Sequence, residues 1–114
     1  MEKLRKLKVG GIDYDVSIKD LSQFDAQNSF RMGQHHEMNA TIEISDKLSK
    51  QKRDQTFVHE LLHAIVCESG LELDDEETVV NQMGLMLYQV LKDNDLSLIR
   101  ESKEEINISQ LCVK

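Results

Sequence analysis

The sequence predicts a single α+β domain, because segments with strand periodicity come first and segments with helix periodicity follow them. The chain has 114 residues, of which 39% are hydrophobic and 31% are charged, and this balance is typical of one globular domain. We therefore expect residues 1–114 to form one domain, in which N-terminal β-hairpins build a sheet that packs on two helices.

Two β-hairpins are expected in the N-terminal half. Apolar residues alternate with polar ones over residues 7–18, and Gly10-Gly11 interrupts this alternation with a dipeptide that favours a tight hairpin turn. Residues 30–32 and 40–44 also favour extended structure, and the polar residues 37–39 between them indicate a second turn. The first half of the chain is therefore predicted to supply the sheet.

Two long amphipathic helices are expected in the C-terminal half. The first covers about residues 49–69 and ends at Gly70, because apolar residues recur at the helix spacing i, i+3, i+4 and i+7. The second begins in the acidic run 74–77, whose carboxylates suit the positive end of a helix dipole, and continues to about Asn94. Residues 96–114 combine features of a short helix and of a strand, and no element is assigned there. The apolar stripe of the second helix runs through Val80, Met83, Leu87 and Leu91, and core packing is expected of Met83, Met86 and Leu87.

Charge and composition exclude several classes of partner. The chain carries 14 basic and 21 acidic residues, a net charge of −7, whereas proteins that bind nucleic acid directly need clustered basic residues. No apolar run approaches the ~20 residues that cross a bilayer, so we expect no membrane segment. Only two cysteines occur, Cys67 and Cys112, and no secretory leader opens the sequence, which favours the reducing cytoplasm.

One motif with chemical consequences lies in the first predicted helix. Residues 59–63 read His-Glu-Leu-Leu-His, so His59 and His63 stand one helical turn apart on the same face and can bind one zinc ion. Glu60 is rotated away from this pair, and from there its carboxylate can accept a proton from a water molecule that the metal activates. The spacing therefore predicts a zinc hydrolase in which Glu60 is the general base.

A third metal ligand is expected outside this motif, because a catalytic zinc ion usually has three protein ligands and one open position. Glu77 lies 14 residues after His63, beyond the turn at Gly70. Gly84 follows Glu77 on nearly the same helix face, where the lack of a side chain would let the second helix approach the first closely. Glu76 is the main alternative, and either carboxylate could instead only stabilise the start of the helix.

Three other residues have side chains that could take part in such a site. Cys67 follows His63 by one turn, but one ion cannot easily reach three successive turns of a straight helix, so we expect a half-buried cysteine rather than a ligand. His35 and His36 fall in the second predicted hairpin. They could line a substrate cleft or polarise a carbonyl, although exposed turn histidines are the more common case.

The stretch from residue 56 to residue 94 resembles the small gluzincin-type metallopeptidases, and most closely the phage- and prophage-encoded relatives of the ImmA/IrrE metallopeptidases. The likeness rests on Thr-Phe-Val-His-Glu-Leu-Leu-His-Ala-Ile, on Gly70-Leu71 and on a later segment similar to the family's Glu-x-x-Ala-x-x-Phe-Ala. That segment maps onto Glu77, Val80, Met83 and Gly84. The resemblance implies that Glu77 is the third ligand, while Val80 and Met83 depart from the smaller or aromatic residues of the family.

The resemblance also implies a fold and an activity. The fold would be a zincin-like (minigluzincin) domain, and the activity would be that of a zinc-dependent metallopeptidase of phage or prophage origin, which acts on a protein or peptide in the host cytosol. Ile42 and its neighbours would form the edge strand along which an extended peptide lies. The alternative is a non-catalytic zinc-binding module for protein interaction, in which a fourth protein ligand would close the metal site.

Overall fold

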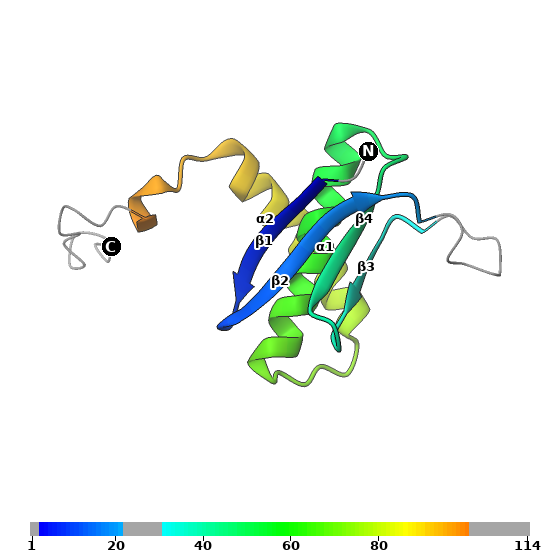
Figure 1. The fold of residues 1–114 in the computed structure, drawn as a ribbon. Coiled ribbons are helices and arrows are strands. Elements are labelled where there is room, and N and C mark those ends of the chain that lie inside the picture. Colours follow the sequence, from blue (N-terminus) through cyan, green and yellow to red (C-terminus); the bar gives the residue numbers. More distant parts are fainter. Residues whose placement is uncertain (1–2, 22–30, 101–114) are drawn as a thin grey trace.

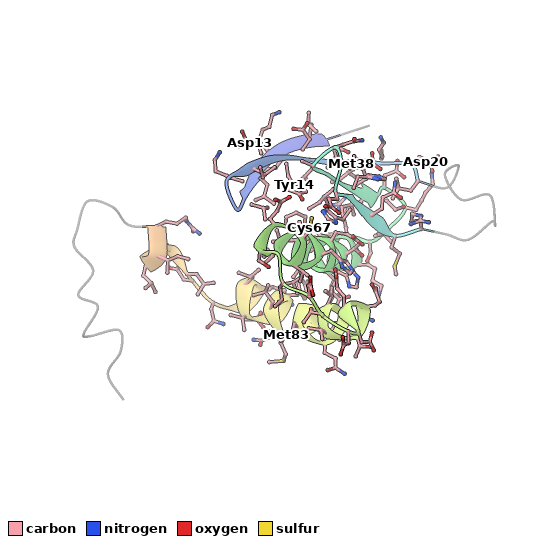
Figure 2. The ribbon with its side chains drawn as sticks, turned by 90° about the horizontal axis from the view of Figure 1, so that it is seen from below. Asp13, Tyr14, Asp20, Met38, Cys67 and Met83 are labelled. Carbon is pink, nitrogen blue, oxygen red and sulfur yellow. The ribbon has the colours of Figure 1, made fainter. Side chains whose placement is uncertain are left out.

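The chain folds as an α+β domain in which one helix is placed between a sheet and a second helix. The computed structural model describes residues 3–21 and 31–100. Figure 1 shows a four-stranded sheet with the order β1-β2-β4-β3, with α1 lying across one of its faces. In the perpendicular view of Figure 2, α2 lies on the side of α1 that faces away from the sheet. The elements are β1 (Lys3–Val9), β2 (Ile12–Lys19), β3 (Gly33–His36), β4 (Thr41–Ser45), α1 (Lys50–Ser69), α2 (Glu76–Asp93) and the 3-10 helix η2 (Ser97–Arg100).

The first predicted hairpin is confirmed, although its first strand begins earlier than expected. β1 and β2 pair in antiparallel fashion from Lys3 opposite Ile18 to Val9 opposite Ile12. The turn between them places Gly10 at φ 59° and Gly11 at φ 88°, a conformation that glycine adopts without steric cost. The alternation separates the two faces of the hairpin, since Tyr14 is fully buried toward α1 while the flanking charged residues face outward.

The second predicted hairpin is also confirmed, but its first strand begins at Gly33 rather than at residue 30. β3 and β4 pair in antiparallel fashion through the turn 37–40, and the backbone oxygen of Met32 accepts a hydrogen bond from the backbone N–H of Ser45. Residues 22–30 lie outside the described part of the chain. Gly33, the first residue of β3, lies where the sheet crosses α1, and a Cβ at this position would stand 2.7 Å from Cγ2 of Thr56.

The expectation that Ile42 lies on an edge strand is wrong. β4 pairs with β2 in parallel and with β3 in antiparallel fashion, so Ile42 stands between Val16 and His35 and is fully buried. The strand on this edge of the sheet is β3. Alternating apolar residues fit an edge strand and an interior strand equally well, and only the non-local pairing with β2 decides between them.

Both helices begin and end within two residues of the predicted positions, because their capping residues are local. The hydroxyl of Ser49 accepts a hydrogen bond from the backbone N–H of Lys52 at the start of α1, and Gly70 ends this helix in the left-handed conformation. At the start of α2, the carboxylate of Asp75 accepts a hydrogen bond from the backbone N–H of Thr78. These caps set where α1 begins and ends and where α2 begins, and so they set the positions of residues 59–63 and of the acidic run in the two helices.

The apolar stripe predicted for α2 is largely wrong. The buried residues of this helix are Val80, Gly84 and Tyr88, whereas Met83 is 57% exposed and Met86 is 63% exposed. Leu87 is only half-buried and Leu91 is exposed. The reason is that, among the described elements, α2 packs mainly against α1, so the strip that touches α1 is the part that is covered, and Figure 2 shows Met83 on the opposite side.

The C-terminal part of the chain contributes little to the described structure. A 3-10 helix covers Ser97–Arg100. The rest of the segment in which the sequence combines helix and strand features, residues 101–114, lies outside the described residues. None of the described helices is both long enough and apolar enough to cross a membrane. The hydrophobic core therefore lies between the sheet and α1, around Tyr14, Ile42, Ile44 and Ala64.

Candidate metal centre

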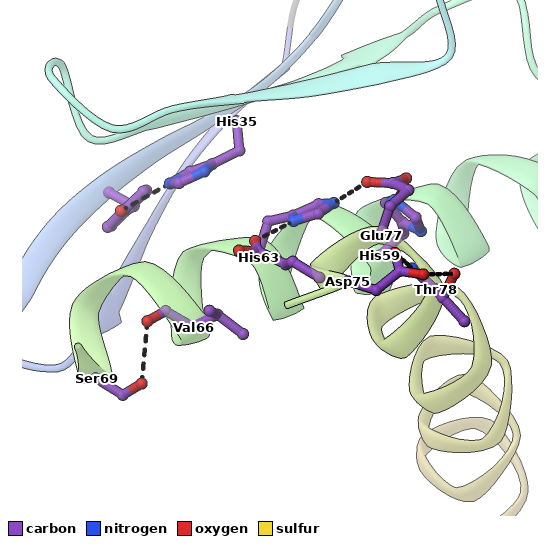
Figure 3. A network of polar contacts seen from close by, with 10 residues as sticks. His35, His59, His63, Val66, Ser69, Asp75, Glu77 and Thr78 are labelled. Carbon is purple, nitrogen blue, oxygen red and sulfur yellow. Dashed lines mark hydrogen bonds and ion pairs between the residues drawn. The ribbon is translucent and has the colours of Figure 1, made fainter. Parts of the chain in front are cut away.

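The candidate metal centre lies where the middle of α1 meets the first turn of α2. Nε2 of His59 is 3.1 Å from one carboxylate oxygen of Glu77, and Nε2 of His63 is 3.0 Å from the other. The ligand atoms of these three residues all lie within 4.8 Å of one another, so they can hold one metal ion. Figure 3 shows Glu77 next to both imidazole rings. The connection between α1 and α2, which passes through Gly70, thus brings Glu77 next to the histidine pair, as the sequence predicts.

Glu76 occupies a different place from Glu77. One of its carboxylate oxygens lies 2.7 Å from Nδ1 of His63, the ring nitrogen that faces away from Glu77. A carboxylate in this position accepts the Nδ1 proton, fixes the orientation of the ring and leaves Nε2 free to bind a metal. Of the two glutamates that the sequence leaves open, Glu77 is therefore the one that faces the ligand nitrogens, and Glu76 supports His63.

The donor set fits zinc. Two imidazole nitrogens and one carboxylate are common ligands of catalytic zinc, and three protein ligands leave one coordination position open. Within residues 3–21 and 31–100, no second group of three such side chains comes this close together. Cys67 is half-buried and stands apart from the group, as expected. Burial, followed by the nearby Glu37, raises the pKa of the Cys67 thiol, which disfavours the thiolate that metals bind.

Glu60 lies beside the histidines and is 8% exposed. Burial raises the pKa of its carboxyl group above the usual value, and the neighbouring His59 and His63 oppose this shift. β3 covers the stem of the side chain, because a Cβ at Gly33 would stand 3.2 Å from Cγ of Glu60. A buried carboxylate with a raised pKa, held next to two imidazoles, is suited to accept and return a proton.

Two cavities flank the histidine pair, and both are bordered by His59, Glu60 and Glu77. One has a volume of about 400 Å³ and extends between α1 and α2 to Leu85. The other has a volume of about 370 Å³ and extends along β3 to His35. Side chains that could hold a metal thus border two cavities, one between the helices and one along β3.

The two neighbouring histidines of β3 lie on opposite faces of the sheet. His36 is on the outer face, where its Nε2 lies 3.2 Å from the carboxylate of Glu43. His35 is on the inner face, and its ring stacks on Tyr14 with a centroid distance of 5.7 Å. Burial, followed by the nearby His63, lowers the pKa of His35, which keeps its ring neutral near pH 7. The expectation of two exposed turn histidines is therefore wrong, because both lie in β3 and are half-buried, and His35 borders the cavity along this strand.

Sequence reasoning missed two contacts around the site, although it had considered Glu76 as a possible ligand. Glu68, at the end of α1, accepts a hydrogen bond of 2.7 Å from the hydroxyl of Tyr14, and Glu76 supports His63. These contacts join residues far apart in the chain, so no spacing rule reveals them. The inward orientation of His35 follows from its pairing with Ile42, a signal that the hairpin alternation already contained.

Comparison with protein-family models, with curated proteins and with solved structures gives no match to this chain. The function of this chain is therefore inferred from the geometry of the site and the chemistry of its residues. Both centre on the motif at residues 59–63 and its contact with the start of α2.

Proposed function

We propose that this protein is a zinc-dependent metallopeptidase with a minigluzincin-like fold, in which His59, His63 and Glu77 bind the metal and Glu60 is the general base. The observation that carries the proposal is the convergence of the three ligand side chains, within 4.8 Å of one another, next to a buried glutamate. This arrangement joins a three-ligand metal site to a proton acceptor, and hydrolysis at a metal requires both.

The chemistry divides between the metal and the protein. A bound zinc ion supplies a Lewis acid that polarises the scissile carbonyl and makes water more acidic. Glu60 accepts the proton from the attacking water, and its raised pKa allows it to hold that proton until the leaving amine takes it. Glu76 keeps the ring of His63 in place through Nδ1.

A peptide is the substrate class that the surroundings of the site favour. β3 is the edge strand nearest the motif, and it pairs only with β4 within the described part of the chain, so its outer edge can add an extended peptide. The two cavities on either side of the ligands give such a chain space on both sides of the reacting bond. The resemblance of residues 56–94 to peptidases of phage and prophage origin supports the same substrate class, with the host cytosol as the place of action.

A non-catalytic zinc-binding module is the second candidate. The observation in its favour is the exposed apolar side of α2, where Met83 and Met86 offer a surface to another protein. Against it stands the ligand count, because a structural zinc site is closed by four protein ligands and the group within the described residues has three. Bound zinc without any hydrolysis would favour this candidate.

The test begins with the metal. Elemental mass spectrometry of the purified, tag-free chain should find about one zinc per molecule. Glu60→Gln should keep this zinc and abolish cleavage of a proteome-derived peptide library, with cleavage read by mass spectrometry. Glu72→Gln, at an exposed glutamate between the helices, is the matched control and should behave like the wild type. A Glu60→Gln protein that cleaves normally would contradict the role of Glu60.

A further inference from the structure

His35 borders the metal cleft from the side of the sheet. It lies on β3 opposite His63 of α1. Both residues line the cavity along β3, and both also line a further cavity that extends toward Gly70 and Glu76. Figure 3 shows His35 reaching from the sheet toward α1, over the stretch that carries His63 and Val66. His35 is not among the ligand side chains, so the proposed metal chemistry does not use it. A half-buried histidine therefore stands at the edge of the cleft, outside the set of possible ligands.

The hydrogen bonds of Tyr14 fix which nitrogen of His35 carries a proton. Tyr14 is fully buried, and its hydroxyl donates its single proton to Glu68 over 2.7 Å. The same oxygen lies 3.0 Å from Nε2 of His35, so it can only accept there, and Nε2 must be the donor. Glu68, Tyr14 and His35 thus form a chain of hydrogen bonds from α1 through β2 to β3.

The other ring nitrogen remains available to a ligand. In a neutral imidazole with its proton on Nε2, Nδ1 is an acceptor. Within the described parts of the chain, the hydrogen bond of the ring is the one between Nε2 and Tyr14. The ring also stacks on Tyr14, with an angle of 23° between the ring planes, and this contact favours the same orientation as the hydrogen bond. The histidine that borders the cleft therefore has a hydrogen-bond acceptor at Nδ1.

We propose that His35 is a substrate-binding residue, whose Nδ1 accepts a hydrogen bond from a backbone N–H of the bound peptide, and that Tyr14 and Glu68 are positioning residues that fix its tautomer. This inference rests on the proposed peptidase function and extends it to the recognition of the substrate backbone. A backbone N–H is the donor that every peptide offers to a β-strand edge, and His35 stands on that edge.

The test measures binding of two hydroxamates to the zinc-loaded full-length chain by calorimetry. Acetohydroxamate has the metal-binding group alone, whereas N-acetyl-dileucine hydroxamate adds backbone N–H groups. His35→Phe keeps a ring that can stack on Tyr14 and removes both nitrogens. It should weaken the dileucine compound about 3–10-fold, the value of one neutral hydrogen bond, and leave acetohydroxamate and zinc affinities unchanged. His35→Asn, which keeps an acceptor close to the position of Nδ1, should recover part of the loss.

The controls separate binding from folding. His36→Phe makes the same change on the outer face of β3 and should leave the affinity for both compounds unchanged. Tyr14→Phe removes the hydroxyl that fixes the tautomer, so nitrogen NMR of His35 should change from the Nε2–H form to a mixture of the two tautomers. This spectroscopic result does not depend on zinc, substrate or the stability of the His35 variants.

The outcomes distinguish the two proposals. Equal affinity of the wild type and His35→Phe for the dileucine compound, with zinc bound to both, would overturn the role of His35 and leave the peptidase proposal standing. An unchanged His35 tautomer in Tyr14→Phe would overturn the positioning role of Tyr14 and Glu68. A wild-type chain that binds no zinc would overturn the proposed function, and the role of His35 with it.

Discussion

The two neighbours of α1 at the candidate metal centre pack against it in different ways. On one side, β3 crosses the helix so closely that a Cβ at Gly33 would lie 2.7 Å from Cγ2 of Thr56. On the other side, a Cβ at Gly84 of α2 would lie 3.7 Å from Cδ1 of Leu62, an ordinary van der Waals distance. The sheet packs against the motif so closely that an added methyl group would clash, whereas on the α2 side an added methyl group would fit in ordinary contact.

From this difference we expect the candidate metal centre to have a rigid part and a more loosely held part. His59, Glu60 and His63 belong to a helix that is covered by the sheet on one side and by α2 on the other. Glu77 is 63% exposed at its side chain and comes from a helix that is covered on one side only. Its contacts with the two histidines are polar, so a metal shared between them would join α2 to α1.

The largest expected effect comes from the rigid part. His63→Ala removes one of the two proposed ligands that stand one turn apart on the same helix, and the remaining pair would not hold a metal as three ligands do. We expect the zinc content measured by elemental mass spectrometry to fall from about one per chain to near zero. His36→Ala, on the outer face of the sheet, should keep its zinc. Full zinc content in His63→Ala would show that the ligand set is wrong.

The next largest effect is a difference in stability between a core variant and a variant on the outer side of α2. Ile42 is fully buried between the sheet and α1, so Ile42→Ala leaves a cavity and should lower the free energy of unfolding by about 2–5 kcal/mol. Met83 is 57% exposed, and Met83→Ala should change the same quantity by less than about 0.5 kcal/mol. Urea denaturation of both variants measures the contrast. A large loss in Met83→Ala would mean that this side of α2 is covered in solution.

Local patterns in the sequence predict much of the fold. The Gly10-Gly11 turn, the caps at Ser49 and Gly70 and the acidic start of α2 all act within a few residues, and each is found where the sequence places it. The histidine pair is equally local, because a single helical turn separates its members. The position of Glu77 next to the histidines could be predicted because one short connection joins the two helices.

Non-local arrangements could not be predicted in the same way. The parallel pairing of β2 with β4 places Ile42 inside the sheet, and no periodicity in β4 reveals this. The exposure of Met83 depends on how few elements cover α2, which is a property of the whole architecture. The contact between Tyr14 and Glu68 joins residues 54 positions apart, so it appears only once the strands and α1 are assembled.

A third prediction concerns the effect of zinc on amide hydrogen exchange in α1 and in α2. Zinc that binds only the folded protein stabilises it by about 2.7 kcal/mol when its free concentration is 100 times Kd. Because Glu77 is the contribution of α2 to the site, we expect zinc to slow amide hydrogen exchange in the first turns of α2 more than in α1. Hydrogen exchange with mass spectrometry, with and without a chelator, measures this. Equal protection of both helices would contradict the distinction between a rigid and a loosely held part.

Substitution of the two glycines tests the packing difference directly. Gly33→Ala places a methyl group against Thr56 and against the stem of Glu60, and overpacking of this kind should lower the free energy of unfolding by about 1–3 kcal/mol. Thermal denaturation measures the loss. The double variant Gly33→Ala with Thr56→Ser, which removes the methyl group at 2.7 Å, should recover part of it. No recovery would mean that the strain lies elsewhere along β3.

Gly84→Ala should have the smallest effect, and its sign is opposite. A Cβ at this position would meet Cδ1 of Leu62 at 3.7 Å and Cα of His59 at 3.8 Å, and both are ordinary contacts. Alanine also has a higher helix propensity than glycine, so this variant should gain about 0.5–1 kcal/mol in the free energy of unfolding while zinc affinity stays unchanged. A loss of stability or of zinc binding in Gly84→Ala would show that α2 needs the close approach of a glycine, and that both sides of α1 are packed equally tightly.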